Sequence, residues 1–262
     1  MIQDFSKFKR FFAFGCSFTQ YNWPTWADIL SKEMDGIFYN LGMRGSGNLA
    51  ISCRIAEANT RYKFCETDLI IVMFSTFCRE DRYVEGRWRG HGNIYNQEYY
   101  PQDFVKKFAD PDFYTIRDLA LIELITNYLR SLDCKSVFLS SSSLRSLQDL
   151  INTVVNHDVS NQCNSIYNDL IEAMPSITLQ DLIQASDPHG SFTYKIQGKE
   201  RVDGHPNPKT AYEYLRQLDF PLTDKSKNYA DQCYEMLLPC RDQDDIHKTF
   251  PEIQFDRKYD CF

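Results

Sequence analysis

The sequence contains no apolar run long enough to cross a bilayer, which argues against a transmembrane helix. Its first residues, MIQDFSKFKRFF, lack the ordered basic, apolar and small-residue zones of a secretory signal. Basic residues are not in excess either, since 29 Lys and Arg stand against 36 Asp and Glu, a net charge of −7. A phosphate backbone needs a basic surface. We therefore expect a cytoplasmic protein with no membrane span and no nucleic-acid partner.

The nine cysteines are scattered, with no Cys-x-x-Cys pair. This pattern favours reduced thiols over a disulfide scaffold and gives no sign of a cysteine zinc site. The five histidines are scattered as well, so we expect no metal. The chain also lacks a G-x-G-x-x-G dinucleotide fingerprint, internal repeats and low-complexity tracts. We therefore expect no cofactor.

What the sequence does contain is an alternation of short apolar runs and amphipathic segments. Five runs predict strands, at residues 10–15, 36–42, 68–75, 136–142 and 176–179. Helical patterns are predicted at 26–34, 49–62, 113–132, 161–173 and 208–218. In the longest of these, one apolar face is predicted to contain Phe113, Ile116, Ala120, Leu121, Leu124, Ile125, Tyr128 and Leu132. The alternation predicts an α/β fold, a three-layer α/β/α sandwich with a five-stranded parallel sheet.

Two segments interrupt this alternation. Residues 79–112 form a long connection after the third predicted strand, and residues 220–262 follow the last predicted helix. We predict one domain, residues 1–219, with an insertion at about 79–112 and a C-terminal extension over 220–262. The composition does not decide whether the extension packs on the domain or binds a partner, so a homo-oligomer or an assembly partner stays open.

Three polar segments stand out: two directly follow predicted strands, and the third is a loop before the last predicted helix. Ser17 follows the first predicted strand, and three glycines lie within NLGMRGSGN, residues 40–48, after the second. Near the end of the domain, Asp203 stands two residues before His205 on a proline-stiffened loop. Alone, the Ser17 segment is weak evidence of a site, the glycine segment is better explained as a flexible turn, and the Asp203 segment is equally well explained as a surface turn. Because ligands bind at the carboxyl ends of parallel strands, we expect all three to converge at one edge of the sheet.

Together, these segments resemble the SGNH, or GDSL-like, hydrolase superfamily, over about residues 11–218. FGCSFT, residues 14–19, resembles its nucleophile block, NLGMRGSGN its second block, and DGHPNP, residues 203–208, its last block. The resemblance implies a flavodoxin-like α/β/α sandwich. It also implies hydrolysis of esters or acyl groups, often on carbohydrates or lipids, without a metal.

Site roles follow from the resemblance by position. Ser17 would be the nucleophile, His205 the base that takes its proton, and Asp203 the acid that fixes the imidazole. The backbone N–H groups of Ser17 and Gly45 would form the oxyanion hole. Cys16 is adjacent to the nucleophile, and we expect it to be packed or inert.

One block departs from the family pattern. Members usually have Gly-x-Asn-Asp after the third strand, whereas this strand ends VMFSTFCRED, without the asparagine. Ser75 or Thr76 can offer a hydroxyl to the oxyanion instead, and Arg79 can reach into the site. Removing one such donor typically lowers turnover about 100- to 1000-fold.

The insertion is rich in arginine and aromatic residues. Four of its aromatic side chains can stack on sugar rings: Trp88, Tyr95, Tyr99 and Tyr100. Three of its arginines, Arg82, Arg87 and Arg89, can meet carboxylates or phosphates, and our candidate substrate-binding residues are Arg79, Trp88 and Tyr95. The alternative, which we favour, is that these side chains pack against the domain or a second subunit.

Two hypotheses of function follow. The first is a serine hydrolase, an esterase or deacylase acting on a small-molecule or carbohydrate ester such as an acetylated carbohydrate. The alternative is a catalytically silent SGNH-like protein that binds a glycan or has a structural or assembly role. The missing asparagine favours the second, whereas the presence of Ser17, Gly45, Asp203 and His205 favours the first.

Overall fold

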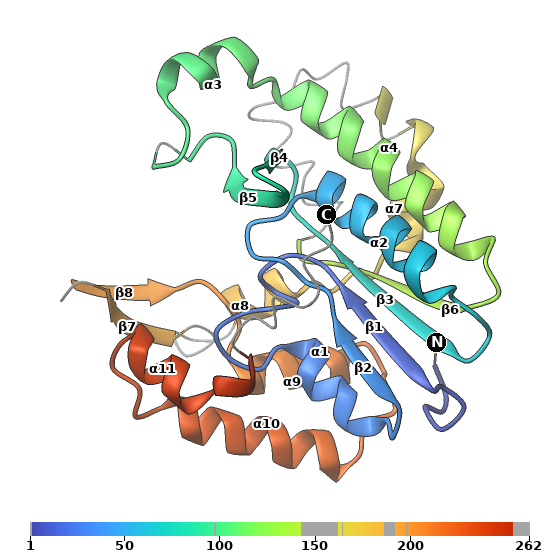
Figure 1. Cartoon of the computed structure of the whole chain (residues 1–262), viewed down its shortest axis with the longest axis vertical. Helices are drawn as coiled ribbons and strands as arrows, with labels where there is room; N and C mark the ends of the chain where they lie inside the picture. The colour runs from blue at the N-terminus through green and yellow to red at the C-terminus, as the bar shows by residue number, and fades with distance from the viewer. Residues whose placement is uncertain are drawn as a thin grey trace.

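The computed structural model describes residues 2–96, 98–142, 162–163, 165–185, 192–196 and 199–253. At its centre lies a parallel sheet of four strands in the order β2-β1-β3-β6 (Figure 1). The strands are β1 (Arg10–Phe14), β2 (Ile37–Asn40), β3 (Asp68–Phe74) and β6 (Lys135–Ser140). This order is that of a flavodoxin-like sheet, in which strands are added on one side of β1 and then, from β3 onward, on the other side. The predicted α/β fold with a parallel sheet is confirmed.

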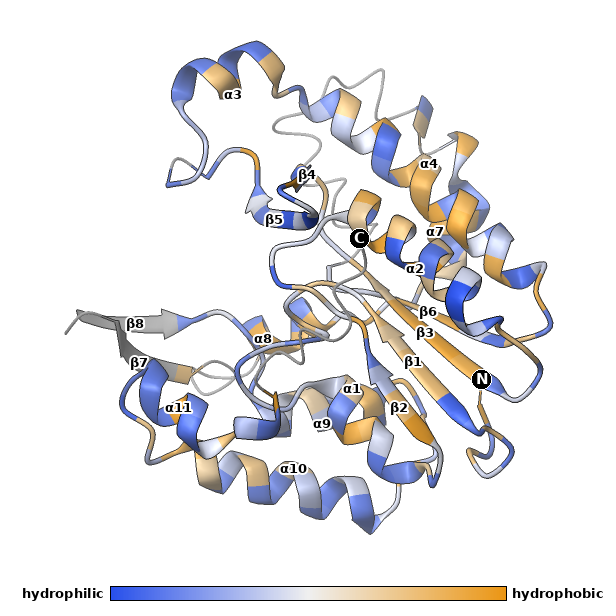
Figure 2. Ribbon diagram, in the orientation of Figure 1, coloured by the Kyte–Doolittle hydropathy of each residue, from blue (hydrophilic) through white to orange (hydrophobic). Residues whose placement is uncertain are grey.

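Alternate side chains of the central strands face two separate cores, because successive residues of a strand point to opposite faces. Phe11 and Ala13 of β1 belong to one core, and Phe12 and Phe14 belong to the other. All seven residues of β3 are buried, as expected of a strand covered on both faces. Figure 2 shows these strands as a hydrophobic layer between the helices.

Helices cover both faces of the sheet (Figure 1). The first core is covered by α1 (Trp26–Leu30), α8 (Leu179–Ala185), α9 (Pro208–Gln217) and α10 (Asp224–Leu237). The second is covered by α2 (Asn48–Tyr62), α4 (Pro111–Arg130) and α7 (Asn168–Ala173). The predicted helices 49–62 and 208–218 match α2 and α9. The predicted helix 26–34 divides into α1 and the 3-10 helix η1 (Ser31–Glu33). The predicted helix 161–173 ends with α7, and part of it lies outside the described residues.

The predicted strand at residues 176–179 is wrong. Leu179 is the first residue of α8. Thr178 N and Oγ1 donate to Asp181 Oδ2 at 2.9 and 2.7 Å, and Asp181 N donates back to Thr178 Oγ1 at 3.3 Å. This reciprocal pairing is a capping box, which starts a helix. The Thr-x-x-Asp spacing, rather than the apolar character of the run, therefore determines the local structure.

The insertion and the extension both form regular structure. The insertion contains an antiparallel hairpin of β4 (Arg79–Val84) and β5 (Arg87–Asn93), followed by α3 (Gln102–Phe108). The extension contains α10, α11 (Gln243–Thr249) and the 3-10 helix η2 (Pro251–Ile253). A second hairpin, β7 (Phe192–Ile196) with β8 (Lys199–Asp203), precedes α9 and was not predicted. In the described residues the extension packs on the domain, with α10 against α9 and α1.

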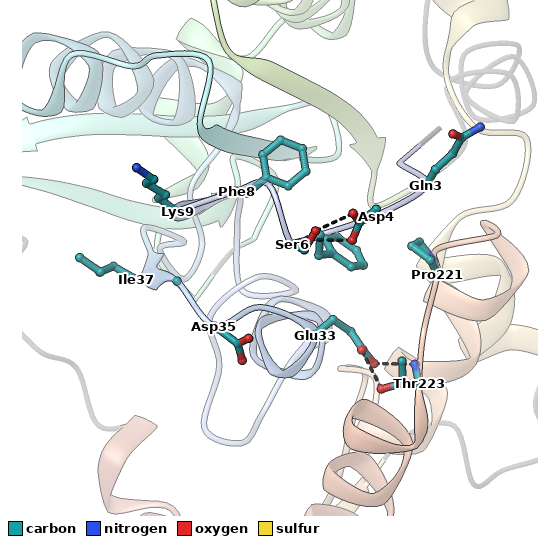
Figure 3. A pocket seen from close by; sticks show the side chains of 12 residues that line it. Gln3, Asp4, Ser6, Phe8, Lys9, Glu33, Asp35, Ile37, Pro221 and Thr223 are labelled. Carbon is teal, nitrogen blue, oxygen red and sulfur yellow. Dashed lines mark hydrogen bonds between the residues drawn. The ribbon is translucent and has the colours of Figure 1, made fainter.

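A cavity of about 760 Å³ lies at the amino ends of the strands (Figure 3). It is lined by Phe8 and Lys9, which precede β1, and by Ile37, the first residue of β2. On its wall, Glu33 accepts hydrogen bonds from Thr223 N at 2.7 Å and Thr223 Oγ1 at 2.8 Å. The cavity is therefore at the opposite edge of the sheet from Ser17.

The apolar face predicted for α4 is wrong for half of its members, since Phe113, Ile116, Ala120 and Leu124 are exposed, whereas Ile125, Tyr128 and Leu132 pack in the second core. Phe113, Ile116 and Leu124 are 54%, 47% and 64% exposed. The buried face contains Tyr114, Thr115, Asp118, Leu119, Ile122, Ile125, Thr126 and Leu129. Polar contacts with the insertion accompany this orientation, since the Tyr114 hydroxyl donates to Glu80 Oε2 at 2.6 Å. Apolar spacing alone did not predict which face of α4 is buried, because apolar residues lie on both the exposed and the buried face.

Asp118 is a fully buried carboxylate on α4. Burial raises the pKa of Asp118 to about 7, although the Arg117 guanidinium, which donates to Asp118 Oδ1 at 2.7 and 2.9 Å, opposes the rise. The ordinary pKa of the group is 3.8. The folded state therefore favours the protonated acid, and this contribution to stability is complete below pH 3.8 and is lost as the pH rises through about 7.

We predict that Asp118→Asn becomes progressively more stable relative to the unmodified protein as the pH rises, because the amide has no charge to bury. The gain in the free energy of unfolding between about pH 4 and pH 7 is expected to be on the order of 2–4 kcal/mol. Urea unfolding at a series of pH values measures it. The control is Asp133→Asn, which changes an exposed carboxylate near the end of α4. It should leave the dependence of the unfolding free energy on pH unchanged. Parallel pH curves for Asp118→Asn and the unmodified protein would contradict the account.

Candidate active site

Ser17 lies in the turn that directly follows β1. Thr19 N donates to the Cys16 carbonyl at 2.9 Å and closes this turn. A Cβ at Gly15 would lie 2.1 Å from Thr19 Oγ1 and 2.9 Å from the carbonyl oxygen of Met73, so the turn needs glycine there. The Cys16 side chain is fully buried in the first core, as predicted, whereas Ser17 is 7% exposed.

The loop that contains His205 is held at both sides. Downstream, Asn207 is the N-cap of α9 and accepts a hydrogen bond from Thr210 N at 3.0 Å. From the N-terminal part of the chain, the Trp23 indole N–H donates to the Pro206 carbonyl at 2.9 Å. Helix capping and this bond to Trp23 therefore fix the backbone around His205.

The fold brings together the three side chains that were predicted to form a triad. His205 Nε2 lies 2.8 Å from Ser17 Oγ, across 188 residues of sequence. His205 Nδ1 lies 2.5 Å from Asp203 Oδ1, which also accepts the His205 backbone N–H at 2.9 Å. The His205 side chain is 24% exposed and that of Asp203 is 4% exposed. The base is thus within hydrogen-bond reach of the hydroxyl on one side and of the acid on the other.

Asp203 is stabilised as a carboxylate. Its burial alone would raise its pKa, but the pKa is lowered, because hydrogen bonds and charge from His205 and a hydrogen bond from Tyr21 outweigh burial. The Tyr21 hydroxyl donates to Asp203 Oδ2 at 2.5 Å. An ionised Asp203 accepts the Nδ1 proton of His205, which leaves the lone pair of Nε2 directed at the Ser17 hydroxyl.

The glycine-rich loop after β2 lies beside the turn of Ser17. Met43 N donates to the Gly15 carbonyl at 2.9 Å, and Ser46 Oγ contacts the same oxygen at 3.3 Å. Gly45 has a φ of 70°, in the left-handed region that favours glycine. Within the described ranges, no protein hydrogen bond uses the backbone N–H of Ser17 or of Gly45.

The insertion supports this loop, which sequence reasoning missed. Asp81 of β4 accepts Gly47 N at 2.7 Å and Ala50 N at 2.9 Å, so it caps the amino end of α2. The backbone of Gly90, on β5, lies directly against Gly45, where a Cβ would come within 2.3 Å of the Gly90 carbonyl oxygen. The only local sequence signal for this capping contact was Asp81 itself, an acid within the segment predicted to be an insertion.

Ser75 and Thr76, the other predicted oxyanion donors, follow β3. Ser75 N donates to Asn48 Oδ1 at 2.8 Å, and Asn48 Nδ2 donates to the Ser75 carbonyl at 3.1 Å. The Ser75 hydroxyl is buried and has no partner among the described residues. Thr76 Oγ1 accepts from Arg79 Nε at 3.0 Å, and Arg79 Nη1 donates to the Ser46 carbonyl at 3.3 Å. Arg79 therefore links the loops after β2 and β3, and the hydroxyl proton of Thr76 remains available.

Trp88 and Tyr95, the predicted substrate-binding aromatics, form no hydrogen bond or ring contact with the triad in the part of the chain that is described. Trp88 is half-buried and meets Tyr83 edge-to-face at 5.6 Å. Tyr95 is 39% exposed, and partial burial raises its pKa to about 12. Trp88 stands two residues before Gly90, which places it on the hairpin that borders the glycine-rich loop.

The same described ranges contain no metal-ligand cluster, no disulfide and no membrane-spanning helix. No three His, Cys, Asp or Glu side chains gather there as ligands for a metal ion. Eight cysteines are described and all are free thiols. No helix of the described chain is long and apolar enough to cross a membrane.

No protein-family model matches the chain, and no curated protein matches it either. Among solved structures, it is similar to a lipolytic protein of the G-D-S-L family from Veillonella parvula, with 16% identity, a TM-score of 0.44 and coverage of 81% of this chain and 99% of that one. A putative lipolytic protein of the G-D-S-L family from Desulfitobacterium hafniense is 12% identical, with a TM-score of 0.42 and coverage of 80% of this chain and 99% of that one. An acetyl xylan esterase from Geobacillus stearothermophilus is 12% identical, with a TM-score of 0.40 and coverage of 83% of this chain and 99% of that one. At these identities and TM-scores, the likenesses do not bear on what this chain acts on.

We predict that Gly45→Ala lowers the free energy of unfolding by about 2–4 kcal/mol, because the new Cβ meets the Gly90 backbone at a left-handed φ. Gly86→Ala is the matched control, since Gly86 has a φ of 77° but open space around it. The control should lose about 1 kcal/mol from backbone strain alone. Urea unfolding of both variants measures the difference. Equal losses would show that the hairpin does not press on the glycine-rich loop.

Proposed function

We propose that this chain is a serine hydrolase that cleaves ester or acyl groups. The observation that carries the proposal is the line of contacts from Ser17 Oγ to His205 Nε2 at 2.8 Å and from His205 Nδ1 to Asp203 Oδ1 at 2.5 Å. Serine is a weak nucleophile unless a base takes its proton, and a neutral imidazole held by a carboxylate is such a base.

In the first half of the reaction, the Ser17 oxygen attacks the ester carbonyl while its proton passes to His205 Nε2. The tetrahedral intermediate then breaks its bond to the alcohol oxygen, which takes the proton from His205. The alcohol leaves, and the acyl group stays on Ser17 as an ester.

In the second half, His205 takes a proton from water, and the resulting hydroxide attacks the acyl carbonyl. Collapse of this intermediate releases the carboxylic acid and returns the proton to Ser17. Throughout, Asp203 stays ionised and balances the positive charge on the imidazole, which agrees with its lowered pKa.

The oxyanion is stabilised by hydrogen-bond donors around the turn of Ser17. The backbone N–H groups of Ser17 and Gly45 are the first two, and the Thr76 hydroxyl is the third, oriented by Arg79 at 3.0 Å. The buried hydroxyl of Ser75 is a further candidate. These donors replace the asparagine that the third block lacks.

For the substrate, we propose a small acyl ester of a cytoplasmic metabolite, with an acetylated carbohydrate as the class to test first. The hairpin that borders Gly45 contains Trp88, whose half-buried ring can stack on a sugar. A catalytically silent glycan-binding or assembly protein is less well supported. Such a protein would have no need of a buried acid, imidazole and hydroxyl in line.

We predict that the protein hydrolyses p-nitrophenyl acetate and that Ser17→Ala lowers kcat/KM by about 10⁴-fold or more, because no other group replaces the nucleophile. Ser131→Ala, at the exposed end of α4, is the matched serine control and should retain full turnover. Steady-state kinetics and the unfolding temperature of each variant are the measurements. An active Ser17→Ala protein would rule the mechanism out. A wild-type protein without turnover that still binds acetylated sugars would favour the silent alternative.

A further inference from the structure

We propose that Tyr21 is a fourth residue of the triad's framework, a positioning residue that fixes both Asp203 and His205. This inference rests on the proposed function, since the groups that Tyr21 holds are its acid and base. Tyr21 lies four residues after Ser17, and none of the sequence motifs includes it.

The hydroxyl of Tyr21 completes the hydrogen bonding of Asp203. It donates to Asp203 Oδ2 at 2.5 Å, while Oδ1 accepts both the ring and the backbone N–H of His205. The carboxylate is therefore held at both oxygens and cannot rotate away from the imidazole. Because the Asp203 side chain is only 4% exposed, water does not readily replace the tyrosine hydroxyl.

The ring of Tyr21 orients the imidazole itself. It stacks on the His205 ring with centroids 3.6 Å apart and planes inclined by 15°. Phe18 meets the same imidazole edge-to-face at 5.5 Å. A ring confined by two aromatic neighbours keeps its plane, and the direction of Nε2 toward Ser17 Oγ is set by that plane. One side chain thus fixes the acid through its hydroxyl and the base through its face.

Tyr21 is itself held by two further side chains. Trp23 meets its ring edge-to-face at 4.6 Å, and the Arg44 guanidinium lies 4.9 Å from its centroid. Arg44 also donates to Asn22 Oδ1, which lies 3.1 Å from Nε2 of His247 on α11. The position of Tyr21 is therefore coupled to the glycine-rich loop through Arg44 and to the C-terminal extension through Asn22.

The extension also packs behind Tyr21 through apolar contacts. Tyr21 and Trp23 form one buried cluster with side chains of α10, α11 and the residues around them: Cys233, Leu237, Cys240, Ile246 and Phe250. Tyr21 is 8% exposed and Trp23 is fully buried. This assigns the extension a role at the active site, which is to supply the wall against which the tyrosine rests.

The test compares Tyr21→Phe with Tyr214→Phe. Tyr21→Phe keeps the stacked ring and removes one hydrogen bond to a charged group, so we expect kcat on p-nitrophenyl acetate to fall about 10- to 100-fold with KM unchanged. Tyr214→Phe removes a buried tyrosine hydroxyl that has no partner in the described residues, and it should leave kcat unchanged. Tyr21→Leu, which also loses the ring, should lose more activity than Tyr21→Phe.

A readout that does not need turnover separates this inference from the proposed function. We expect the proton between His205 Nδ1 and Asp203 to give a far-downfield proton NMR resonance, because the two atoms lie 2.5 Å apart. This resonance should shift in Tyr21→Phe and stay in place in Tyr214→Phe. If the unmodified protein were inactive, the hydrolase proposal would fail, and this resonance would still decide the role of Tyr21. Unchanged kcat and an unchanged resonance in Tyr21→Phe would overturn the inference. Unfolding of Tyr21→Phe under conditions in which Tyr214→Phe stays folded would also overturn it, by assigning Tyr21 to stability alone.

Discussion

The hydrogen bond between His205 and Ser17 joins two ends of the domain, and the remaining structure holds those ends in place. Ser17 is fixed by the turn that leaves β1, where Gly15 allows the backbone to pass close to β3. His205 is fixed by the capped start of α9 and by the bond from Trp23 to Pro206. Because both supports are buried, the 2.8 Å contact is maintained by the core rather than by its own modest strength.

The insertion and the extension, which interrupt the α/β alternation, support opposite sides of this site. The insertion supports the glycine-rich loop, because Asp81 caps α2 and Gly90 packs on Gly45. The extension supports the side of His205, because its helices pack against Tyr21, which stacks on the imidazole. A domain reduced to the strands and helices of the basic alternation would lack both supports. The two segments therefore belong to the site's structure rather than to its periphery.

Local sequence signals were sufficient for the four strands of the sheet, whereas the residues proposed for catalysis were chosen from three short segments taken together and from their resemblance to a family. An apolar run followed by Gly-x-Ser, and an acid two residues before a histidine, are short-range patterns that can be recognised without a structure. The run at residues 176–179 was misjudged because four apolar or small residues fit a strand and a helix start equally well. There, the Thr178–Asp181 pair decided the outcome.

Features that depend on contacts between distant segments were not predictable. The orientation of α4 was not predictable from apolar spacing, because apolar residues lie on more than one face of this helix. Its buried face also contains Tyr114, whose hydroxyl contacts Glu80 of the insertion. The stacking of Tyr21 on His205 requires the chain to bring residues 21 and 205 together, and nothing around Tyr21 indicates it. The pairing of Asn48 with the backbone of Ser75 is of the same kind.

The central claim is that Ser17 is a nucleophile activated by His205. The most direct measurement is reaction with a fluorophosphonate, followed by peptide mapping by mass spectrometry. The account predicts a single phosphonyl adduct on the peptide that contains Ser17, and loss of that adduct in His205→Ala. An unlabelled protein, or an adduct on a different side chain such as Cys16, would contradict it.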